Sequence, residues 1–374
     1  MKCPYCGSED TIRIFSIDRM PTMLGACSIS LLRHVKVLPF TAHLCKNCLL
    51  GFNSSKLDRM ELQFIYDNYI YISPFAGIGR TKYEPILEII KKWCSYNDKI
   101  VEIGCSEGYL LYKLRELGFK NLVGVEPSPQ ADIGISYGLN IIKSYYDGSI
   151  FLEGSVDCFV MSHVFEHFED PFSILRFIKH QLSEMGKIII EVPYFTGFHH
   201  EHLFFYNISF LQRLFRDVGL KIVYGEISND ALRIIAVHRE RDIYADFELE
   251  NETLDYIQKK AFDEYNTFKE NVKKINDYFK SVSNLVWWGA GSSSVILINQ
   301  LEPEIINQRD ILVVDGDKNK WYCYIPGTNI QVKPYTDINQ KKIDLLIIAS
   351  SFYKEILQTI KTLDVQIGKV VIFY

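Results

Sequence analysis

The sequence predicts an α/β protein in three parts: an N-terminal cysteine-containing module, a central seven-stranded Rossmann-like sheet, and a smaller C-terminal Rossmann-like domain. Three observations predict this. Two Cys-x2-Cys pairs lie near the N-terminus, and short apolar strands alternate with helical segments through the middle of the chain. The same alternation returns after a long amphipathic stretch. We expect residues 1–68, 69–240 and 241–374 to form the three parts.

The composition is that of a folded protein without a general affinity for nucleic acid. The 374 residues are 48% hydrophobic and 23% charged, and 41 Lys and Arg stand against 46 Asp and Glu, a net charge of −5. General nucleic-acid binders are usually basic, and no dense group of Lys and Arg accompanies the N-terminal cysteines. We therefore expect no nucleic-acid partner.

The chain shows no targeting or membrane signal. Its first residues leave no room for an apolar signal region, and the long uncharged run at 281–301 is rich in Ser, Asn and Gly, as in a strand–turn–helix. We expect a cytoplasmic protein without a membrane partner, either a monomer or a small homo-oligomer. Thiols stay reduced in the cytosol, so the nine cysteines need another explanation than disulfides.

The paired cysteines predict a structural zinc site. Cys3 and Cys6 form one pair, and Cys45 and Cys48 form the other. Each Cys-x2-Cys turn directs two sulfurs at one ion, and two such turns make a tetrathiolate site. Coincidence and redox-active pairs are the alternatives. The remaining cysteines are expected to act as small apolar residues.

A glycine loop opens the middle segment. The expected strand at 100–103 contains Glu102 and is followed by Gly104 and Gly108, after which a helix is expected at 109–117. Glycines at the end of a first strand let the backbone approach a ligand, and the next helix offers its N-terminal N–H groups. The spacing is GxxxG rather than GxGxxG, which argues against a dinucleotide.

Two carboxylates extend this pattern to a cofactor. Glu126 closes the second strand, where a carboxylate can accept hydrogen bonds from a ribose diol. Asp147, after the third strand, is a candidate contact for adenine. With Glu102, Gly104 and Gly108, they predict binding of S-adenosylmethionine. A Rossmann-like domain for another nucleotide is the alternative.

Two histidine-containing runs follow later strands. The run at 162–171 contains His163 and His167 with a carboxylate, and it lies where strand ends meet the ligand crevice. We include His163 among the cofactor-binding candidates and His167 among the catalytic candidates. A helix-capping turn is the alternative. The run at 198–206 contains the catalytic candidates His200, Glu201 and His202 among many aromatic residues, with a surface loop as the alternative.

The order of the parts and their motifs resemble the three-domain sugar C-methyltransferases of unusual-deoxysugar biosynthesis. The resemblance covers nearly the whole chain. It rests on Cys3, Cys6, Cys45 and Cys48, on 69–73, on 101–104 with 108–111, on 126–128, on His167, on Glu201 with His202, and on 326–328.

The resemblance implies an N-terminal zinc module, a central S-adenosylmethionine domain and a C-terminal domain that helps to hold a nucleotide sugar. The implied setting is the making of a methylated sugar for a polysaccharide or a glycosylated metabolite. The family's catalytic loop resembles Tyr-x-Glu-His, and here His199 stands in the position of the tyrosine. The acceptor atom therefore stays open between carbon and oxygen.

Carbon methylation beside a ketone needs a base for the α-proton and a donor for the enolate. His202, oriented by Glu201, is the candidate base, because imidazole titrates near neutrality. Tyr71 or Tyr69 is the candidate donor to the oxyanion.

Methylation of a sugar hydroxyl, which we slightly favour, needs only deprotonation during attack on the methyl group. A divalent metal lowers the pKa of a hydroxyl and fixes its position. On an extended segment, His200 and His202 would converge while Glu201 points away. With His163 or His167, they predict a second metal site for iron, manganese or zinc. A methyltransferase for another small-molecule acceptor is the lesser alternative.

The C-terminal part begins with one long helix. Apolar residues spaced by threes and fours predict a helix over 254–279 that packs on a neighbouring domain or forms a dimer. The βα units that follow contain Gly289, Gly291 and Asp315, which resemble a shortened dinucleotide fingerprint. We expect this glycine–serine turn to approach the phosphates of the sugar nucleotide. A structural turn and an NAD site are the alternatives.

Two further classes of function compete with the enzyme. A module that only senses S-adenosylmethionine would keep Glu102, Gly104 and Glu126 but would not need the run at 198–206. A zinc-dependent nucleic-acid methyltransferase would use the cysteine module to hold nucleic acid, and the net charge of −5 argues against it.

Overall fold

The computed structural model describes residues 1–374 except 56, 69–72, 76–78, 241–251, 309–310 and 374. The chain forms two compact units. The first unit comprises Met1–Phe15, Thr41–Lys56 and Ile72–Phe262, and the second comprises Ser16–Phe40, Leu57–Tyr71 and Asp263–Tyr374. The N-terminal part therefore contributes to both units. The division at 68 and 240 stays a prediction.

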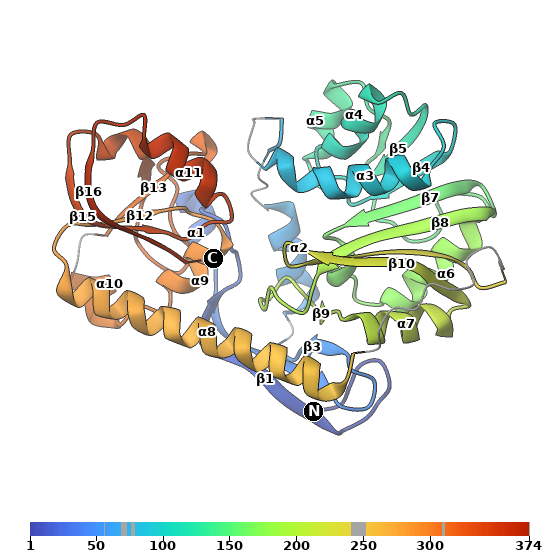
Figure 1. Cartoon of the computed structure of the whole chain (residues 1–374), viewed down its shortest axis with the longest axis horizontal. Helices are drawn as coiled ribbons and strands as arrows, with labels where there is room; N and C mark the ends of the chain where they lie inside the picture. The colour runs from blue at the N-terminus through green and yellow to red at the C-terminus, as the bar shows by residue number, and fades with distance from the viewer. Residues whose placement is uncertain (56, 69–72, 76–78, 241–251, 309–310, 374) are drawn as a thin grey trace. The chain divides into compact units, whose positions relative to one another are not determined.

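A mixed seven-stranded sheet forms the centre of the first unit, as expected for a Rossmann-like methyltransferase fold (Figure 1). Its strand order is β10-β11-β8-β7-β4-β5-β6. The strands from β8 to β6 run parallel, and β11 and β10 form an antiparallel hairpin beside β8. The strands are β4 Lys99–Ile103, β5 Asn121–Val125, β6 Ile141–Ile142, β7 Val156–Ser162, β8 Leu182–Pro193, β10 Leu220–Ser228 and β11 Ala231–His238.

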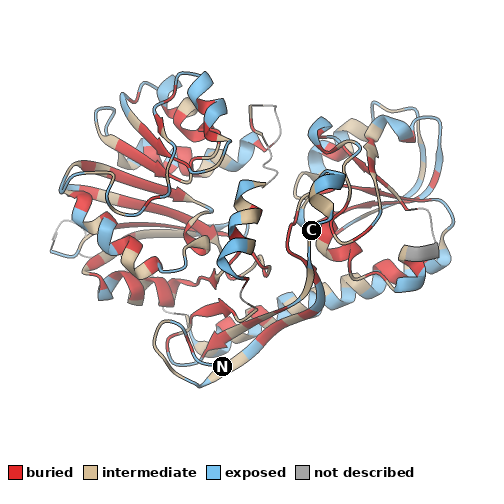
Figure 2. Cartoon of the chain, turned by 180° about the vertical axis from the view of Figure 1, so that it is seen from behind, coloured by how far each residue is buried: buried red, intermediate tan, exposed pale blue. Residues whose placement is uncertain are grey.

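Helices cover both faces of this sheet. Successive apolar residues of its buried strands point to opposite faces, so both faces need a covering layer. Helices α6 and α7 share one core with Val101 and Phe159, whereas α3 and α4 share the other with Ile100 and Val160. The strands are buried and the helices keep exposed outer faces (Figure 2). The helical elements are η1 Arg80–Tyr83, α3 Glu84–Trp93, α4 Tyr109–Glu116, α5 Ala131–Ser136, η2 Phe165–His167, α6 Pro171–Gln181 and α7 Ile208–Asp217.

Strand register brings the functional loops to one side of the sheet. Glu102 pairs with Gly124 on β5 and with Val160 on β7, and Ser162 pairs with Glu191 on β8. The loops after β4, β5, β7 and β8 therefore meet at one side. We call this side the carboxyl edge.

A second sheet has the order β1-β2-β3-β9. Its last two strands pair antiparallel, with Gly51 opposite Phe205. This pairing joins the segment after the second cysteine pair to the segment that follows His202. The strands are β1 Thr11–Pro21, β2 Val37–Cys45, β3 Gly51–Asn53 and β9 Phe204–Phe205.

The second unit contains a parallel five-stranded sheet of order β14-β13-β12-β15-β16, as the βα pattern predicts. Its strands are β12 Leu285–Trp288, β13 Leu312–Asp315, β14 Val332–Pro334, β15 Lys342–Ile348 and β16 Gln366–Ile372. Its helical elements are α1 Ile29–Leu32, α2 Arg59–Asp67, α9 Ser292–Ile298, α10 Pro303–Gln308, η3 Lys318–Lys320, η4 Tyr335–Ile338 and α11 Tyr353–Ile360.

The predicted long helix is α8, Leu254–Ser281, and it has residues in both units. After the glycine turn of the second unit, Asp315 accepts a hydrogen bond from the Ala290 N–H at 2.7 Å and lies 3.4 Å from the Lys320 ammonium. Its other oxygen accepts a hydrogen bond from the Asp317 N–H at 2.8 Å, so both oxygens of this carboxylate have partners within the protein. In the described part of the chain, no helix combines the length and hydrophobicity needed to cross a bilayer.

Candidate functional site

The glycine loop after β4 has a backbone that requires glycine. Gly104 has a φ of 70°, and a Cβ there would lie 2.4 Å from a methyl carbon of Val164. Gly108 has a φ of 75°, and a Cβ there would lie 2.6 Å from Leu139. An L-residue at either position would be strained and would clash. The loop can therefore lie close to a ligand, as the sequence predicts.

Glu126 lies beside this loop, at the end of β5. Its carboxylate accepts hydrogen bonds from the Ser106 N–H at 2.8 Å and from the Ser128 N–H at 2.9 Å. Glu102 is buried within β4, and burial together with the charge of Glu126 raises its pKa well above the usual range. The structure thus brings Glu102, Gly104 and Glu126 together at the carboxyl edge.

Glu107 is a buried carboxylate in this loop that the sequence analysis assigned no role. It accepts hydrogen bonds from the Ser73 hydroxyl at 2.8 Å and from the Phe75 N–H at 3.2 Å. It therefore ties the segment at 73–75 to the glycine loop. A carboxylate directly before Gly108 was the available signal.

The roles expected for Asp147 and Tyr71 stay predictions. Asp147 is exposed, and its Oδ1 accepts hydrogen bonds from the N–H and hydroxyl of Ser149. Its adenine contact stays a prediction. Tyr71 lies outside the described residues, as does Tyr69.

Three residues from two loops converge in what we call the histidine cluster: Glu166, His167 and His202. Their ligand atoms all lie within 4.8 Å of one another. The Nε2 of His202 is 3.8 Å from Oε1 of Glu166, and the rings of His167 and His202 are 4.9 Å apart. Glu166 is only 1% exposed, and neither of its oxygens has a hydrogen-bond partner among the described residues.

Backbone hydrogen bonds hold these loops in place. The Leu203 N–H donates to the Glu166 carbonyl at 2.9 Å, and the Asn53 side chain donates to the carbonyls of His200 and His202. His167 donates from Nδ1 to the Glu201 carbonyl at 2.8 Å. In the neutral ring of His167 this bond leaves the lone pair on Nε2.

The expectation that His200 and His202 converge is wrong. Residues 199–202 form a turn, in which the His202 N–H donates to the His199 carbonyl at 3.2 Å. His202 therefore faces His167 and Glu166, and His200 is not part of the cluster. A turn has no alternation of faces, so the geometry of an extended strand does not apply.

The pairing of His202 with Glu201 is also corrected. The Oε1 atom of Glu201 has no hydrogen-bond partner among the described residues, and burial raises its pKa to about 8. The carboxylate near the His202 ring belongs to Glu166. Burial, and then the charges of His199 and His167, lower the pKa of His202 well below the usual range. Its ring is therefore neutral at pH 7.

His163 lies beside the cluster at the end of β7. Its Nδ1 is 3.7 Å from Glu166, and its Nε2 is 3.0 Å from Glu191. Desolvation opposes the charge, but these two carboxylates outweigh it and raise the pKa of His163 to about 9. The buried Arg233 forms an ion pair with Glu191. Sequence analysis missed Glu191 and Arg233, whose signal is a charge inside an apolar strand.

The four cysteines of the N-terminal part form the cysteine cluster. Cys3 and Cys48 have their sulfurs 3.6 Å apart, as do Cys6 and Cys45, and all four sulfurs lie within 4.8 Å. A tetrahedral ion with metal–sulfur bonds of about 2.3 Å requires sulfur–sulfur edges of about 3.8 Å. The donor set therefore fits a tetrathiolate zinc.

Comparison with known proteins identifies the middle of the chain. Residues 76–224 match a family described as a methyltransferase domain, and residues 281–371 match one described as C2185-like, N-terminal. The first match covers the sheet from β4 to the start of β10 and confirms the prediction of a methyltransferase domain.

Curated relatives are distant and match in part. The C-methyltransferase NovU of Streptomyces niveus is 22% identical over 59% of this chain and 56% of its own length. A tRNA U34 carboxymethyltransferase of Nautilia profundicola is 22% identical over 45% of this chain and 58% of its own. The chain spans between 37% and 60% of the lengths of the curated relatives that it matches.

Solved structures match this chain at low similarity. A SAM-dependent methyltransferase of Aquifex aeolicus has 14% identity and a TM-score of 0.37, and the match covers 48% of this chain and 98% of that one. An S-adenosylmethionine-dependent methyltransferase of Mesorhizobium loti has 14% identity and a TM-score of 0.35, covering 41% and 96%.

Proposed function

We propose that this chain is an S-adenosylmethionine-dependent methyltransferase that acts on a nucleotide-activated sugar. The matched methyltransferase domain supports the class of reaction. The glycine loop and Glu126 support the cofactor, because they offer a close backbone approach and a carboxylate for a ribose. The sugar nucleotide rests on the resemblance to the sugar C-methyltransferases.

The acceptor that we favour is a sugar hydroxyl, and one observation carries this choice. The Glu166 carboxylate is buried without a hydrogen-bond partner among the described residues, in reach of His167 and His202. The charged His163 lies 3.7 Å from this carboxylate without a hydrogen bond to it, so a closer cation or donor would complete the site. Imidazole and carboxylate ligands suit iron, manganese or zinc.

The residues of this second metal site differ from those that the sequence predicts. We assign Glu166, His167 and His202, in place of a set built on His200, His202 and His163. When bound, the metal would supply a Lewis acid that lowers the pKa of the acceptor hydroxyl. The chain's own residues orient this site: the Glu201 carbonyl fixes the tautomer of His167, and Asn53 holds the turn.

Carbon methylation is the second candidate, and two observations favour it. His202 is neutral at pH 7, so its ring can accept an α-proton, with Glu166 rather than Glu201 stabilising the imidazolium that forms. One relative is named a C-methyltransferase. In both candidates the cysteine cluster holds a structural zinc.

Metal content separates the two candidates. We would measure metals per chain by plasma mass spectrometry in the wild type and in a His167→Ala/His202→Ala variant, with His34→Ala/His180→Ala as the matched control. The hydroxyl reaction predicts one zinc plus a second metal that only the first variant loses. A single zinc per chain in the wild type, the variant and the control would contradict the metal-assisted reaction. His202 would then remain as a candidate base.

The acceptor atom is then read directly. Purified protein would be incubated with S-adenosylmethionine that carries an isotope-labelled methyl group and with a panel of nucleotide sugars, including 4-keto-deoxysugars. The chemical shift of the transferred methyl distinguishes a methoxyl from a C-methyl product. No transfer to any nucleotide sugar, with transfer to another small molecule, would overturn the proposed substrate class.

A further inference from the structure

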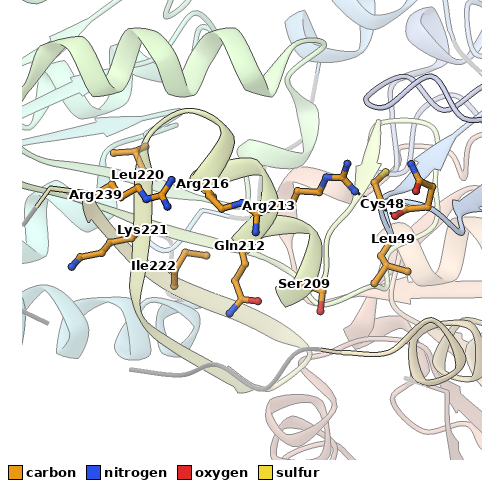
Figure 3. A pocket seen from close by; sticks show the side chains of 11 residues that line it. Cys48, Leu49, Ser209, Gln212, Arg213, Arg216, Leu220, Lys221, Ile222 and Arg239 are labelled. Atoms are coloured by element: carbon orange, nitrogen blue, oxygen red, sulfur yellow. Dashed lines mark hydrogen bonds between the residues drawn. The ribbon is translucent and has the colours of Figure 1, made fainter. Parts of the chain in front are cut away.

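A pocket of about 530 Å³ opens on the first unit. It extends from the second cysteine knuckle to the start of β10. Arg213, Arg216, Lys221 and Arg239 line it, and no acidic residue does so in the described part of the chain. Figure 3 shows these four cationic side chains among the lining residues. We call this site the basic pocket.

Helix α7 supplies half of these cations. Arg213 and Arg216 lie on the same helix face as Ser209 and Gln212, because residues three and four apart are neighbours on a helix. Leu214 and Phe215 face the core instead, and both are fully buried. The Nη1 of Arg213 donates to the Asn47 carbonyl at 3.3 Å, which holds its guanidinium beside the cysteine knuckle.

The β10–β11 hairpin supplies the other half. Lys221 pairs with Val237, two residues before Arg239, and the Arg239 N–H donates to the Gly219 carbonyl at 3.3 Å. The four cations therefore meet although they are distant from Cys48 in the sequence. The sequence near the cysteines contains no dense group of Lys and Arg, but the fold brings four cations into the same pocket as Cys48.

Among the described residues, neighbouring acids offset part of this charge. Asp217 accepts a hydrogen bond from the Tyr5 hydroxyl at 2.6 Å and lies 3.8 Å from the Arg216 Nε. Glu252 accepts hydrogen bonds from the N–H groups of Ile208 and Ser209, so the N-terminus of α7 is already occupied. The side chains of the cations, rather than the helix end, thus define the site.

The basic pocket is separate from the carboxyl edge. Val237, opposite Lys221, pairs with Lys187, six residues before the end of β8 at Pro193, whereas the functional loops follow the ends of the strands. A ligand group held there is not the reacting group. Among the described residues, no aromatic side chain lines the pocket, so these residues offer no surface for stacking a base.

We propose that the basic pocket binds phosphate groups of a substrate or partner, as a diphosphate or as a phosphodiester backbone. Arginine forks match phosphate oxygens in pairs, and a lysine adds a point charge. The inference is independent of the proposed acceptor. The expectation of no nucleic-acid partner stays a prediction, which one arm of the test addresses.

The test measures binding to the full chain by fluorescence anisotropy. The probes are a labelled single-stranded RNA of mixed sequence and inorganic pyrophosphate as competitor. The pocket variant is Arg216→Glu/Lys221→Glu/Arg239→Glu. The control Lys91→Glu/Lys92→Glu/Lys120→Glu changes three exposed lysines of the same unit and alters the net charge equally. Thermal melts check that both variants fold, and Arg216→Gln/Arg239→Gln is the milder substitute.

We expect the pocket variant to bind at least tenfold more weakly and the control to change less than about twofold. Loss of three phosphate contacts lowers the salt slope for a single strand by about 2. Binding of RNA that pyrophosphate displaces only weakly identifies a phosphodiester backbone, and efficient displacement identifies a diphosphate. The proposal fails if neither probe binds, if the control loses as much, or if polyglutamate competes as well as RNA.

Discussion

The cysteine cluster and the histidine cluster both gather metal-binding side chains in the first unit, but they are built in different ways. Each cysteine pair is placed by its own tight turn, and the four sulfurs are already at tetrahedral spacing. The histidine cluster joins loops that follow different strands, and it includes a buried carboxylate without a hydrogen-bond partner among the described residues. The first arrangement is typical of a structural site and the second of a reactive one.

The largest expected effect is on the reactive side. His202→Gln keeps the size of the side chain but removes its ability to bind a metal or accept a proton in the same way. We expect turnover of the acceptor found in the screen to fall by about 10²–10⁴-fold with little change in Tm. His180→Gln, at an exposed histidine, is the control. Retained turnover would remove the histidine cluster from the reaction.

The second effect is on the structural side. Cys45→Ser removes one ligand of the proposed zinc, and the binding energy of such a zinc is also folding energy. We expect the loss of one zinc per chain and a Tm lower by about 10 °C, with Cys323→Ser as control. An unchanged Tm on loss of the metal would show that this cluster does not stabilise the fold.

The third effect concerns the cost in folding stability of burying the Glu102 carboxylate at the carboxyl edge. The pKa of Glu102 is raised in the folded protein, so its contribution to stability is present below the unfolded pKa near 4.3 and is lost as pH rises through the folded pKa. Glutamine does not ionise, so Glu102→Gln avoids this loss of stability at high pH. We expect a Tm higher than wild type by about 2–4 °C at pH 8 and equal near pH 4.

Melts across that range provide the measurement. A difference in Tm that does not depend on pH would mean that burial of the Glu102 carboxylate is not the cause. Glu116→Gln, at an exposed and paired carboxylate on α4, is the matched control.

The smallest effect concerns Asp147 and tests whether this residue belongs to the cofactor site. Asp147 is exposed and its Oδ1 is bonded to Ser149. If it makes no adenine contact, Asp147→Asn changes the affinity for S-adenosylmethionine by less than about twofold and the stability by less than about 0.5 kcal/mol. Isothermal titration measures the first. A tenfold loss of affinity would restore Asp147 to the site.

The sequence predicts what local patterns determine. The methyltransferase sheet follows from apolar strands alternating with helices, and the cysteine cluster follows from two short spacings. The positions of Gly104 and Gly108 follow from backbone conformations that only glycine adopts easily. These features need only neighbouring residues or a repeated pattern.

What the sequence does not predict depends on contacts across the fold. In the sequence, Glu166 is one of several carboxylates in a polar run. Only the order of the strands and the turn at 199–202 place it beside His202. The basic pocket joins residues near 47, 213 and 239 that no window of sequence contains. The division of the N-terminal residues between two units has the same origin, because β1 and β2 each continue from one unit into the other.

The tight packing of Gly104 against Val164 has a consequence for sequence variation. The gap of 2.4 Å from a hypothetical Cβ to the Val164 methyl carbon means that the loops after β4 and β7 share one space. An alanine at 104 therefore requires a smaller residue at 164, and even then the positive φ remains unfavourable. Homologues with a larger side chain at 104 should have a smaller one at 164. Positions 104 and 164 are therefore expected to co-vary although 60 positions separate them.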